Sequence, residues 1–260
     1  MDQTDGMDMT VQRSDRAQSR GDLFAIRGLS LARSTGPGYA LRIPSLRIRA
    51  GEKIAITGPS GCGKSTALDI LGMALKPDSA EEFLFAPAGL TRSVDVAGAW
   101  RKGAQNRLAA LRLQHMGYVL QTGGLLPFLN VYENMELAAR TLALPQRKER
   151  IEHMAERLGI GRLLRSLPGQ LSVGERQRVA IGRALATLPD VILADEPTAS
   201  LDPYHARAVM DIFLGMVEEA GTTLILVTHA PEIVRQAKLK EISMRLEALE
   251  DGMVNAVLEN

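Results

Sequence analysis

A glycine-rich run at residues 58–65 has the clearest chemical potential in the chain. It follows the pattern G-x-x-x-x-G-K-S, and with the next residue its members are Gly58, Pro59, Ser60, Gly61, Cys62, Gly63, Lys64, Ser65 and Thr66. Glycines let a loop curl until its N–H groups point at phosphate oxygens, and a following helix adds a favourable dipole. Lys64 supplies a positive charge for the β- and γ-phosphates of ATP, and the Ser65 hydroxyl is a ligand for Mg²⁺. The run predicts a binding site for a nucleoside triphosphate.

Two adjacent carboxylates follow a short apolar run at residues 191–194. Such a run is typical of a strand buried on both faces, and ligands bind at the carboxyl ends of strands of this kind. Asp195 is expected to hold Mg²⁺ through water, and Glu196 to polarise the water that attacks the terminal phosphate. The alternative is that either acid caps the turn before Pro197. Because the same chain also contains a phosphate-binding loop, the catalytic interpretation of the two carboxylates is favoured.

The chain must also form the elements that bring these residues together. Apolar alternation and short apolar runs predict strands at residues 23–31, 41–48, 53–57, 116–120, 191–194 and 224–227. Helical patterns cover residues 66–75, 108–115 and 204–220, and helical spacing fills residues 125–188. Turns are predicted at residues 35–38 and at Asp251-Gly252, whereas residues 77–106 follow no regular pattern. The order is a β-rich start, an α/β core, an inserted helical block, the core again and a β-rich end.

A third motif narrows the class of protein. Residues 171–178 have the sequence L-S-V-G-E-R-Q-R and continue into an apolar stretch at residues 179–185. This motif resembles the signature of the ABC ATPase family, and the resemblance covers about residues 23–258. It implies an α/β fold of the P-loop NTPase class, with a RecA-like core, an N-terminal antiparallel β subdomain and an α-helical subdomain inserted at about residues 125–188. Residues 1–22, which are charged and poor in apolar side chains, are expected to be a disordered polar tail.

The resemblance implies a dimer in which two chains pack head to tail, so that each completes the other's ATP site. The signature residues Ser172, Gly174 and Glu175 would then lie against the nucleotide held by the partner. Both half-sites are complete in this sequence, so the second ATPase subunit is expected to be a copy of this chain, with a different ATPase as the alternative. Val173 replaces the more usual glycine, and Glu175 the more usual glutamine; both variants occur in the family.

Three single residues follow in the family's order. Gln121 resembles the glutamine that contacts Mg²⁺ and reports the nucleotide state to a membrane partner. Asp202 resembles a residue of the loop that crosses the dimer interface, and His229 the histidine that contacts the γ-phosphate. Taken singly, each has a structural alternative: a strand-end amide, a helix cap and a packed histidine. The expected catalytic residues are Glu196, His229, Gln121 and Lys64, and the expected metal ligands are Ser65, Gln121 and Asp195.

Two further positions qualify this interpretation of the site. The aromatic residue that stacks on adenine in the family is absent from its expected place near Arg33, whose guanidinium plane can also stack on a base. Cys62, inside the phosphate-binding loop, is interpreted as a small filler residue. The sharper hypothesis is that modification of its thiol blocks nucleotide binding.

Within the family, residues 39–41, 125–127 and 195–202 are similar to the small stand-alone ATPases of lipoprotein-release, macrolide-export and cell-division systems. The resemblance implies a separate integral-membrane permease, and the choice of cargo belongs to that subunit. The apolar and aromatic run at residues 125–132 follows Gln121 directly. One hypothesis is that part of it lines a groove for a helix of the permease; the alternative is that it packs in the core of the helical block.

Composition argues against several other classes. The 260 residues carry 31 Lys and Arg against 30 Asp and Glu, a balance that does not favour nucleic-acid binding. No apolar run approaches the roughly 20 residues that span a bilayer, and the single cysteine fits a reducing compartment. We therefore expect a cytoplasmic protein, held at the inner face of the cell membrane through its permease partner.

Two rival functions stay open. The first is an ABC ATPase that acts on nucleic acid or on another macromolecular complex. The interval from Gln121 to Leu171 contains no heptads, and the chain has one cassette, so this function is disfavoured. The second is a nucleotide-gated regulatory module without hydrolysis, which the presence of Glu196 and His229 disfavours.

Overall fold

The computed structural model of the chain describes residues 21–33, 39–248 and 254–259. Its strands are β1 (Asp22–Arg33), β2 (Tyr39–Arg49), β3 (Lys53–Thr57), β4 (Glu82–Phe85), β5 (Val94–Asp95), β6 (Met116–Val119), β7 (Val191–Asp195), β8 (Thr223–Val227), β9 (Lys240–Ala248) and β10 (Val254–Glu259). Its helices are α1 (Lys64–Leu71), α2 (Val96–Arg101), α3 (Gln105–His115), α4 (Val131–Thr141), α5 (Arg147–Arg157), α6 (Val173–Leu185), α7 (Pro203–Ala220) and α8 (Pro231–Gln236). Two short 3₁₀ turns, Gly161–Leu163 and Pro168–Gln170, precede α6.

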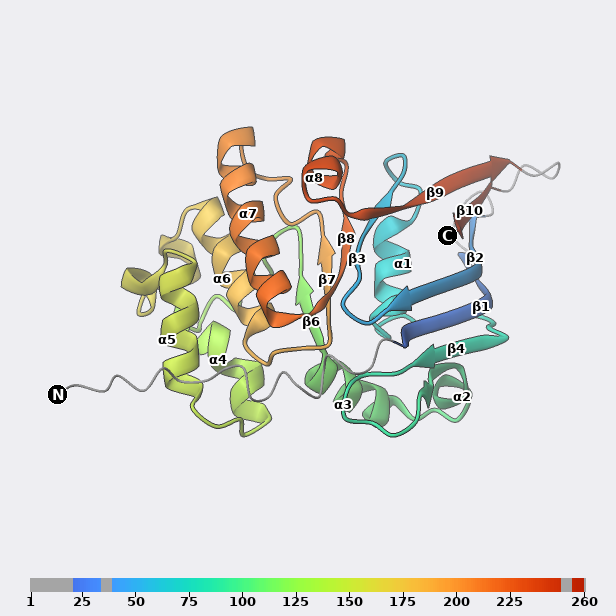
Figure 1. Ribbon diagram of the computed structural model, residues 1–260, viewed down its shortest axis with the longest axis horizontal. Helices are drawn as coiled ribbons and strands as arrows, with labels where there is room; N and C mark the ends of the chain where they lie inside the picture. Colours follow the sequence, from blue (N-terminus) through green and yellow to red (C-terminus); the bar gives the residue numbers. More distant parts are fainter. Residues whose placement is uncertain (1–20, 34–38, 249–253, 260) are drawn as a thin grey trace.

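The described strands join into one sheet with the order β5-β4-β1-β2-β10-β9-β3-β8-β7-β6 (Figure 1). Strands β3, β8, β7 and β6 are parallel neighbours. Their side chains alternate between two cores. In β7, Val191 and Leu193 pack with α1 on one face, whereas Ile192 and Ala194 pack with α6 and α7 on the other. Burial of both faces of this parallel sheet explains the unbroken apolar runs in the sequence.

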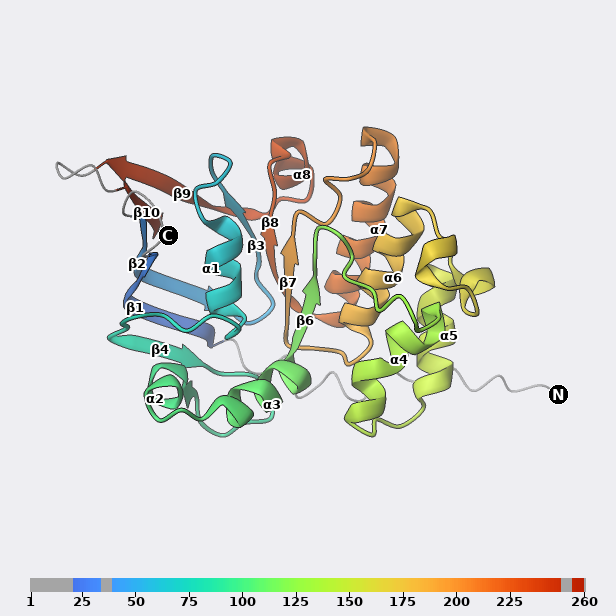
Figure 2. The same cartoon turned by 180° about the vertical axis from the view of Figure 1, so that it is seen from behind.

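The N-terminal part of the sheet is antiparallel, as the family resemblance implies. Strand β1 pairs antiparallel with both β2 and β4, and β4 with β5. Phe24, Phe83 and Phe85 are fully buried where β1 and β4 meet. Helices α4, α5 and α6 lie together at the other end of the molecule (Figures 1 and 2). The predicted α/β class is therefore confirmed.

Some predicted boundaries shift. The helix predicted to reach residue 75 ends at Leu71, because Gly72 caps it and Met73 takes a positive φ of 55°. Residues 77–106 hold β4, β5, α2 and the first residues of α3, which are too short to show a hydrophobic period. Regular helix in the helical block begins at residue 131 and not at 125.

Several expectations fall on parts of the chain that lie outside the described residues. These are residues 1–20 of the polar tail predicted at residues 1–22, the turn at residues 35–38, the turn at Asp251-Gly252 and the side chain of Arg33. The predicted tail is too long at its end, because β1 begins at Asp22. The pairing that the second turn implies is nevertheless present, because β9 and β10 run antiparallel as neighbours.

Helix α6 packs so closely on β6 that Gly117 has no room for a side chain. A Cβ at Gly117 would lie 2.3 Å from the carbonyl oxygen of Ala184. Replacing Gly117 with alanine is expected to lower the free energy of unfolding by about 2 kcal/mol, because the backbone of α6 must move away. Urea unfolding measures this change.

A second glycine provides the matched control. Gly215 lies in α7, and a Cβ there would have no neighbouring atom within 4 Å. Gly215→Ala is therefore expected to stabilise the protein by up to about 1 kcal/mol through helix propensity. A Gly117→Ala protein as stable as the unsubstituted chain would contradict the close packing of α6 on β6.

Candidate active site

The predicted catalytic segments meet at one edge of the sheet. The phosphate-binding loop follows β3, His229 comes two residues after β8, Asp195 and Glu196 stand at the end of β7, and Gln121 comes two residues after β6. Because β3, β8, β7 and β6 are adjacent and parallel, their carboxyl ends lie side by side. Strand pairing alone therefore brings these segments, which are distant in the sequence, to one edge.

The phosphate-binding loop curls around the ammonium group of its own lysine. Gly61 and Gly63 take positive φ angles of 74° and 96°, which side chains disfavour. Lys64 is 4% exposed, and its Nζ donates to the carbonyl oxygens of Gly58 at 3.0 Å and Pro59 at 2.7 Å. Two neutral acceptors therefore hold the ammonium charge inside the loop, where a phosphate group can replace them.

The other residues of the loop divide into exposed and buried ones. Ser60 is exposed, and so is Ser65 in the first turn of α1, whereas Thr66 is buried. The Cys62 side chain is fully buried in the core that also contains α1, and its Sγ lies 3.8 Å from Nζ of Lys64. This burial supports the interpretation of Cys62 as a filler residue.

Gln121 and Asp195 lie on neighbouring strand ends. Val119, the last residue of β6, stands beside Ala194 in the register of β6 with β7. Gln121 is exposed two residues further along, and Asp195, which directly follows Ala194, is half-buried. The amide and the carboxylate thus belong to the same part of the edge, as their proposed share in one metal site requires.

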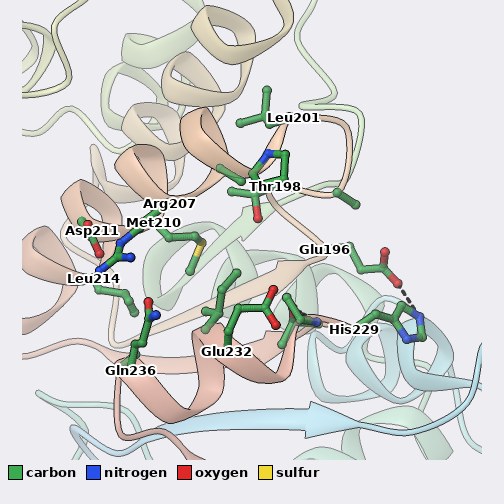
Figure 3. Close-up of a pocket in the computed structure, with 17 residues that line it drawn as sticks. Glu196, Thr198, Leu201, Arg207, Met210, Asp211, Leu214, His229, Glu232 and Gln236 are labelled. Carbon is green, nitrogen blue, oxygen red and sulfur yellow. Dashed lines mark hydrogen bonds and ion pairs between the residues drawn. The ribbon is translucent and has the colours of Figure 1, made fainter.

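Glu196 and His229 are in direct contact. Oε1 of Glu196 lies 2.9 Å from Nε2 of His229 (Figure 3), with the two side chains 22% and 41% exposed. The backbone N–H of Glu196 donates to the carbonyl oxygen of Val227 at 2.9 Å, which fixes the end of β7 beside the end of β8. Glu196 also takes a positive φ of 44°, a strained conformation of the kind that collects at functional sites. A carboxylate held beside an imidazole in this way is equipped to orient and deprotonate a water molecule.

A groove between α7 and α8 opens beside this pair (Figure 3). Its volume is about 770 Å³, and Glu196 and His229 line one end of it. Met210 and Leu214 give it an apolar wall on α7, while Glu232 lines it from α8. None of its lining residues belongs to the phosphate-binding loop, so the groove adjoins the catalytic pair without including the phosphate site.

Tyr118, on β6, is a half-buried residue near the site that the sequence motifs do not identify. Its hydroxyl donates to Oδ1 of Asp69 at 2.9 Å, which ties β6 to α1. Burial, followed by the hydrogen bond to Asp69, raises the pKa of the Tyr118 phenol far above its ordinary value. The phenol therefore stays protonated and keeps this link at any physiological pH.

Comparison with known proteins agrees with this geometry. The family model described as "ABC transporter" matches residues 41–199, which is more than half of the chain. The chain belongs to the ABC transporter family. It is an ATP-binding subunit of that family with ATPase activity.

Two relatives and one solved structure of ABC proteins illustrate the similarity. The chain is 42% identical to the lipoprotein-releasing system ATP-binding protein LolD of Paramagnetospirillum magneticum, over 74% of this chain and 81% of LolD. It is 39% identical to a probable export ATP-binding/permease protein, MacB of Pseudomonas entomophila, over 95% of this chain but only 36% of MacB. The dimeric, post-hydrolysis structure of the ATP-binding cassette MJ0796 with ADP and phosphate matches with a TM-score of 0.68 and 29% identity, over 89% of this chain and 96% of that one. Within the described ranges, no helix of this ABC protein combines the length and apolar character needed to cross a bilayer.

The ABC signature forms the amino-terminal cap of α6. The Ser172 Oγ accepts from the N–H of Glu175 at 3.3 Å, and the Glu175 carboxylate accepts from the N–H of Ser172 at 2.9 Å. This reciprocal capping box explains why serine and an acid stand three residues apart. The hydrogen bond from the Ser172 backbone, followed by that from its hydroxyl, holds the pKa of Glu175 below its usual value. Glu175 is thus an anion at the same helix start.

Asp202 is likewise a helix cap in this ABC chain. Its Oδ1 accepts from the backbone N–H groups of Tyr204 and His205 at 3.2 Å, and Oδ2 lies 2.6 Å from Nδ1 of His205. The backbone hydrogen bond from His205, followed by that from its side chain, lowers the pKa of Asp202. The helix cap, which is the structural alternative for Asp202 in the sequence, is therefore present. This cap does not prevent Asp202 from also lying at a dimer interface.

One chain does not bring its own signature to its own phosphate-binding loop. Helices α6 and α1 pack on opposite faces of the parallel strands and lie on opposite sides of them in both views (Figures 1 and 2). Ser172 and Gly174 therefore stand apart from Lys64 in the single ABC chain.

Three polar residues hold the loop after β6: Asn134 on α4, and Gln177 and Arg183 on α6. The sequence motifs assign this role to none of them, although Gln177 stands within the signature run. A signal was present for Arg183, because it interrupts the apolar stretch at residues 179–185 of the ABC signature helix. Asn134 and Gln177 are buried polar side chains, and nothing in the local pattern distinguishes them from surface residues.

Proposed function

We propose that this ABC ATPase works as a motor in which two copies close around two Mg-ATP molecules and open again after hydrolysis, and that this cycle drives a separate membrane permease. The contact between Glu196 and His229, at the edge that also carries the phosphate-binding loop, is the observation that carries the proposal. The contact supports Glu196 as the base and His229 as its orienting partner, at the edge where the terminal phosphate would lie.

The proposed roles follow from the chemistry of the side chains. Glu196 orients and deprotonates the attacking water, and His229 positions the carboxylate and contacts the γ-phosphate. Lys64, with the N–H groups of residues 58–65, stabilises the charge that develops on the phosphate oxygens. Asp202 is assigned to the interface with the second copy.

The residues proposed for the metal fit Mg²⁺. Ser65, Gln121 and Asp195 offer a hydroxyl, an amide and a carboxylate oxygen at the same edge, all of them hard ligands. Among the described residues no group of three or more His, Cys, Asp or Glu forms a preformed cage. Mg²⁺ needs none, because it keeps waters and substrate phosphates as ligands and requires only one or two carboxylates. When bound, Mg²⁺ would neutralise phosphate charge and align the leaving group.

In the proposed dimer, the second copy supplies the signature residues that stand apart from the first copy's own phosphate-binding loop. The start of α6, with Ser172, Gly174 and Glu175, would face the nucleotide of the second copy. The dimeric state of MJ0796 and its similarity to this chain support that arrangement. We further propose that residues 23–258 are one ABC ATPase domain with its helical part at about residues 125–188, and that it acts at the cytoplasmic face of a membrane. The similarity to MacB, which is named as an ATP-binding/permease protein, supports a permease as the partner of the ATPase.

Phe128 is the residue we assign to the permease contact. It is 72% exposed, whereas Val131 nearby is fully buried and Tyr132 packs against the helical core. Only part of the run at residues 125–132 thus offers a surface. Phe128→Asp is expected to weaken binding to the permease by at least about tenfold, because a charge replaces an exposed aromatic anchor. Co-sedimentation of the full chain with membranes of the source organism measures binding.

Two controls belong to this experiment. Leu90, 45% exposed between β4 and β5, is a comparable apolar residue on another surface, and Leu90→Asp should bind membranes like the unsubstituted chain. The ATPase rate of the isolated Phe128→Asp protein should be unchanged. Equal retention of Phe128→Asp and the unsubstituted chain on membranes would remove Phe128 from the contact.

A further inference from the structure

The loop between β6 and α4, residues 120–130, owes its shape to side chains of α6. Gln177 is 2% exposed, and its Nε2 donates to the carbonyl oxygen of Leu120 at 3.3 Å. Arg183 donates from Nη1 to the carbonyl oxygen of Gly124 at 2.6 Å and from Nη2 to that of Gly123 at 2.9 Å. Backbone acceptors that no strand or helix satisfies are thus satisfied by one neighbouring helix.

These bonds hold both ends of a turn that presents Gln121. The N–H of Gly123 donates to the carbonyl oxygen of Leu120 at 2.9 Å, which closes a four-residue turn with Gln121 and Thr122 at its centre. Gly124 has a positive φ of 56°, and a Cβ there would lie 2.7 Å from Cδ1 of Leu120. The turn therefore has little freedom of its own, and its position follows that of α6.

The second half of the loop is fixed by α4. Asn134 is fully buried; its Oδ1 accepts from the N–H of Leu126 at 2.8 Å, and its Nδ2 donates to the carbonyl oxygen of Leu129 at 2.9 Å. Phe128 lies between these two anchors. Helix α4 in turn packs tightly on α6, since a Cβ at Gly182 would lie 2.5 Å from Cε of Met135.

Helix α6 therefore joins three features of the molecule. It begins at the signature cap, it holds the Gln121 turn, and it packs on the helix that holds the Phe128 segment. We infer that Arg183 is a positioning residue, which fastens the Gln121 turn to the signature helix so that Phe128, Gln121 and Ser172 move as one body. This inference rests on the proposed function for the role of Gln121, whereas the fastening itself rests on the hydrogen bonds.

Burial supports the assignment of Arg183. Partial removal from water lowers the pKa of its guanidinium group, and the two carbonyl oxygens compensate part of this cost. The planar fork of arginine reaches two acceptors together, whereas the single ammonium of lysine is a point donor. Lysine is therefore expected to replace arginine only in part.

The test compares Arg183→Met with Arg140→Met in the full chain. Arg140 is an exposed residue in the last turn of α4, so it provides the same substitution without the loop contacts. Hydrogen exchange of peptides that cover residues 121–126 should become about tenfold faster in Arg183→Met, because the turn loses two charge-assisted hydrogen bonds. Exchange in residues 58–65 should not change.

Kinetics provide the second readout. In Arg183→Met, kcat for ATP should fall about tenfold while KM stays within about twofold, because Gln121 is misplaced but the phosphate-binding loop is intact. In both readouts Arg183→Lys should lie between Arg183→Met and the unsubstituted protein. Arg183→Lys becomes the test variant if Arg183→Met does not fold. Arg140→Met should match the unsubstituted protein.

The outcomes separate this inference from the proposed function. Unchanged exchange in residues 121–126 would overturn the fastening by Arg183. Two other outcomes would show that Arg183 has a general structural role and would also overturn the inference. One is faster exchange in residues 121–126 together with a raised KM for ATP, and the other is exchange that becomes equally faster in the rest of the chain. Faster exchange confined to the loop with an unchanged kcat would support the fastening and would remove the role of Gln121, which belongs to the proposed function.

Discussion

Replacing Glu196 with glutamine is expected to lower the rate of ATP hydrolysis at least about a hundredfold while leaving ATP binding intact. Glutamine keeps the size of the side chain and can still accept a hydrogen bond, but it cannot take a proton from water. The contact of 2.9 Å between Glu196 and His229 would persist in a neutral form. Because hydrolysis opens the proposed dimer, the variant should also accumulate as a closed dimer in Mg-ATP.

Two measurements check this result together. Phosphate release reports hydrolysis, and light scattering reports mass with and without Mg-ATP. Glu232→Gln is the matched control, because Glu232 is another carboxylate on the same groove and its variant should hydrolyse ATP normally. Normal hydrolysis by Glu196→Gln would show that the catalytic base lies elsewhere, and a variant that stays monomeric in Mg-ATP would contradict a self-sufficient homodimer.

Replacing Lys64 with methionine is expected to weaken ATP binding by on the order of a hundredfold. Methionine has a similar length and tolerates burial, but it removes the charge that two phosphate groups would share. Each charge-assisted hydrogen bond contributes about 1.5–3 kcal/mol, so the loss of two is large. In the structure the same ammonium donates to the carbonyl oxygens of Gly58 and Pro59.

Titration with a fluorescent ATP analogue measures the change in affinity. Lys53→Met is the matched control, because Lys53 lies in the strand before the loop and pairs with Glu218 on the surface. It should bind ATP like the unsubstituted protein. Thermal unfolding of both variants without nucleotide separates a folding defect from a binding defect. Unchanged affinity in Lys64→Met would remove Lys64 from the phosphate site.

The local parts of the site could be predicted because the sequence encodes them locally. A strand, a glycine loop and a helix follow one another within residues 53–71, so spacing alone predicts the phosphate-binding loop. The apolar run before Asp195 indicates a buried strand with equal clarity. The cap at Ser172 and Glu175, although not predicted, is encoded just as locally, because a capping box needs only two residues three positions apart.

The non-local parts could not be predicted from the same patterns. Hydrophobic periodicity indicates that a strand exists, but it does not indicate which strand lies beside it, so the place of β8 between β3 and β7 needed the fold. That place decides the contact between Glu196 and His229. The hydrogen bonds from Gln177 and Arg183 to a loop about 60 residues earlier are also non-local, so local patterns do not indicate them.

The position of β10 has a consequence for the folding of the protein during its synthesis on the ribosome. This strand pairs with β2 on one side and β9 on the other, and it is the link between the antiparallel and parallel parts of the described sheet. Of the described strands it is the last to be translated. Until it emerges, the nascent chain carries two half-sheets with open edges, and the closing step of assembly waits until this strand has left the ribosome.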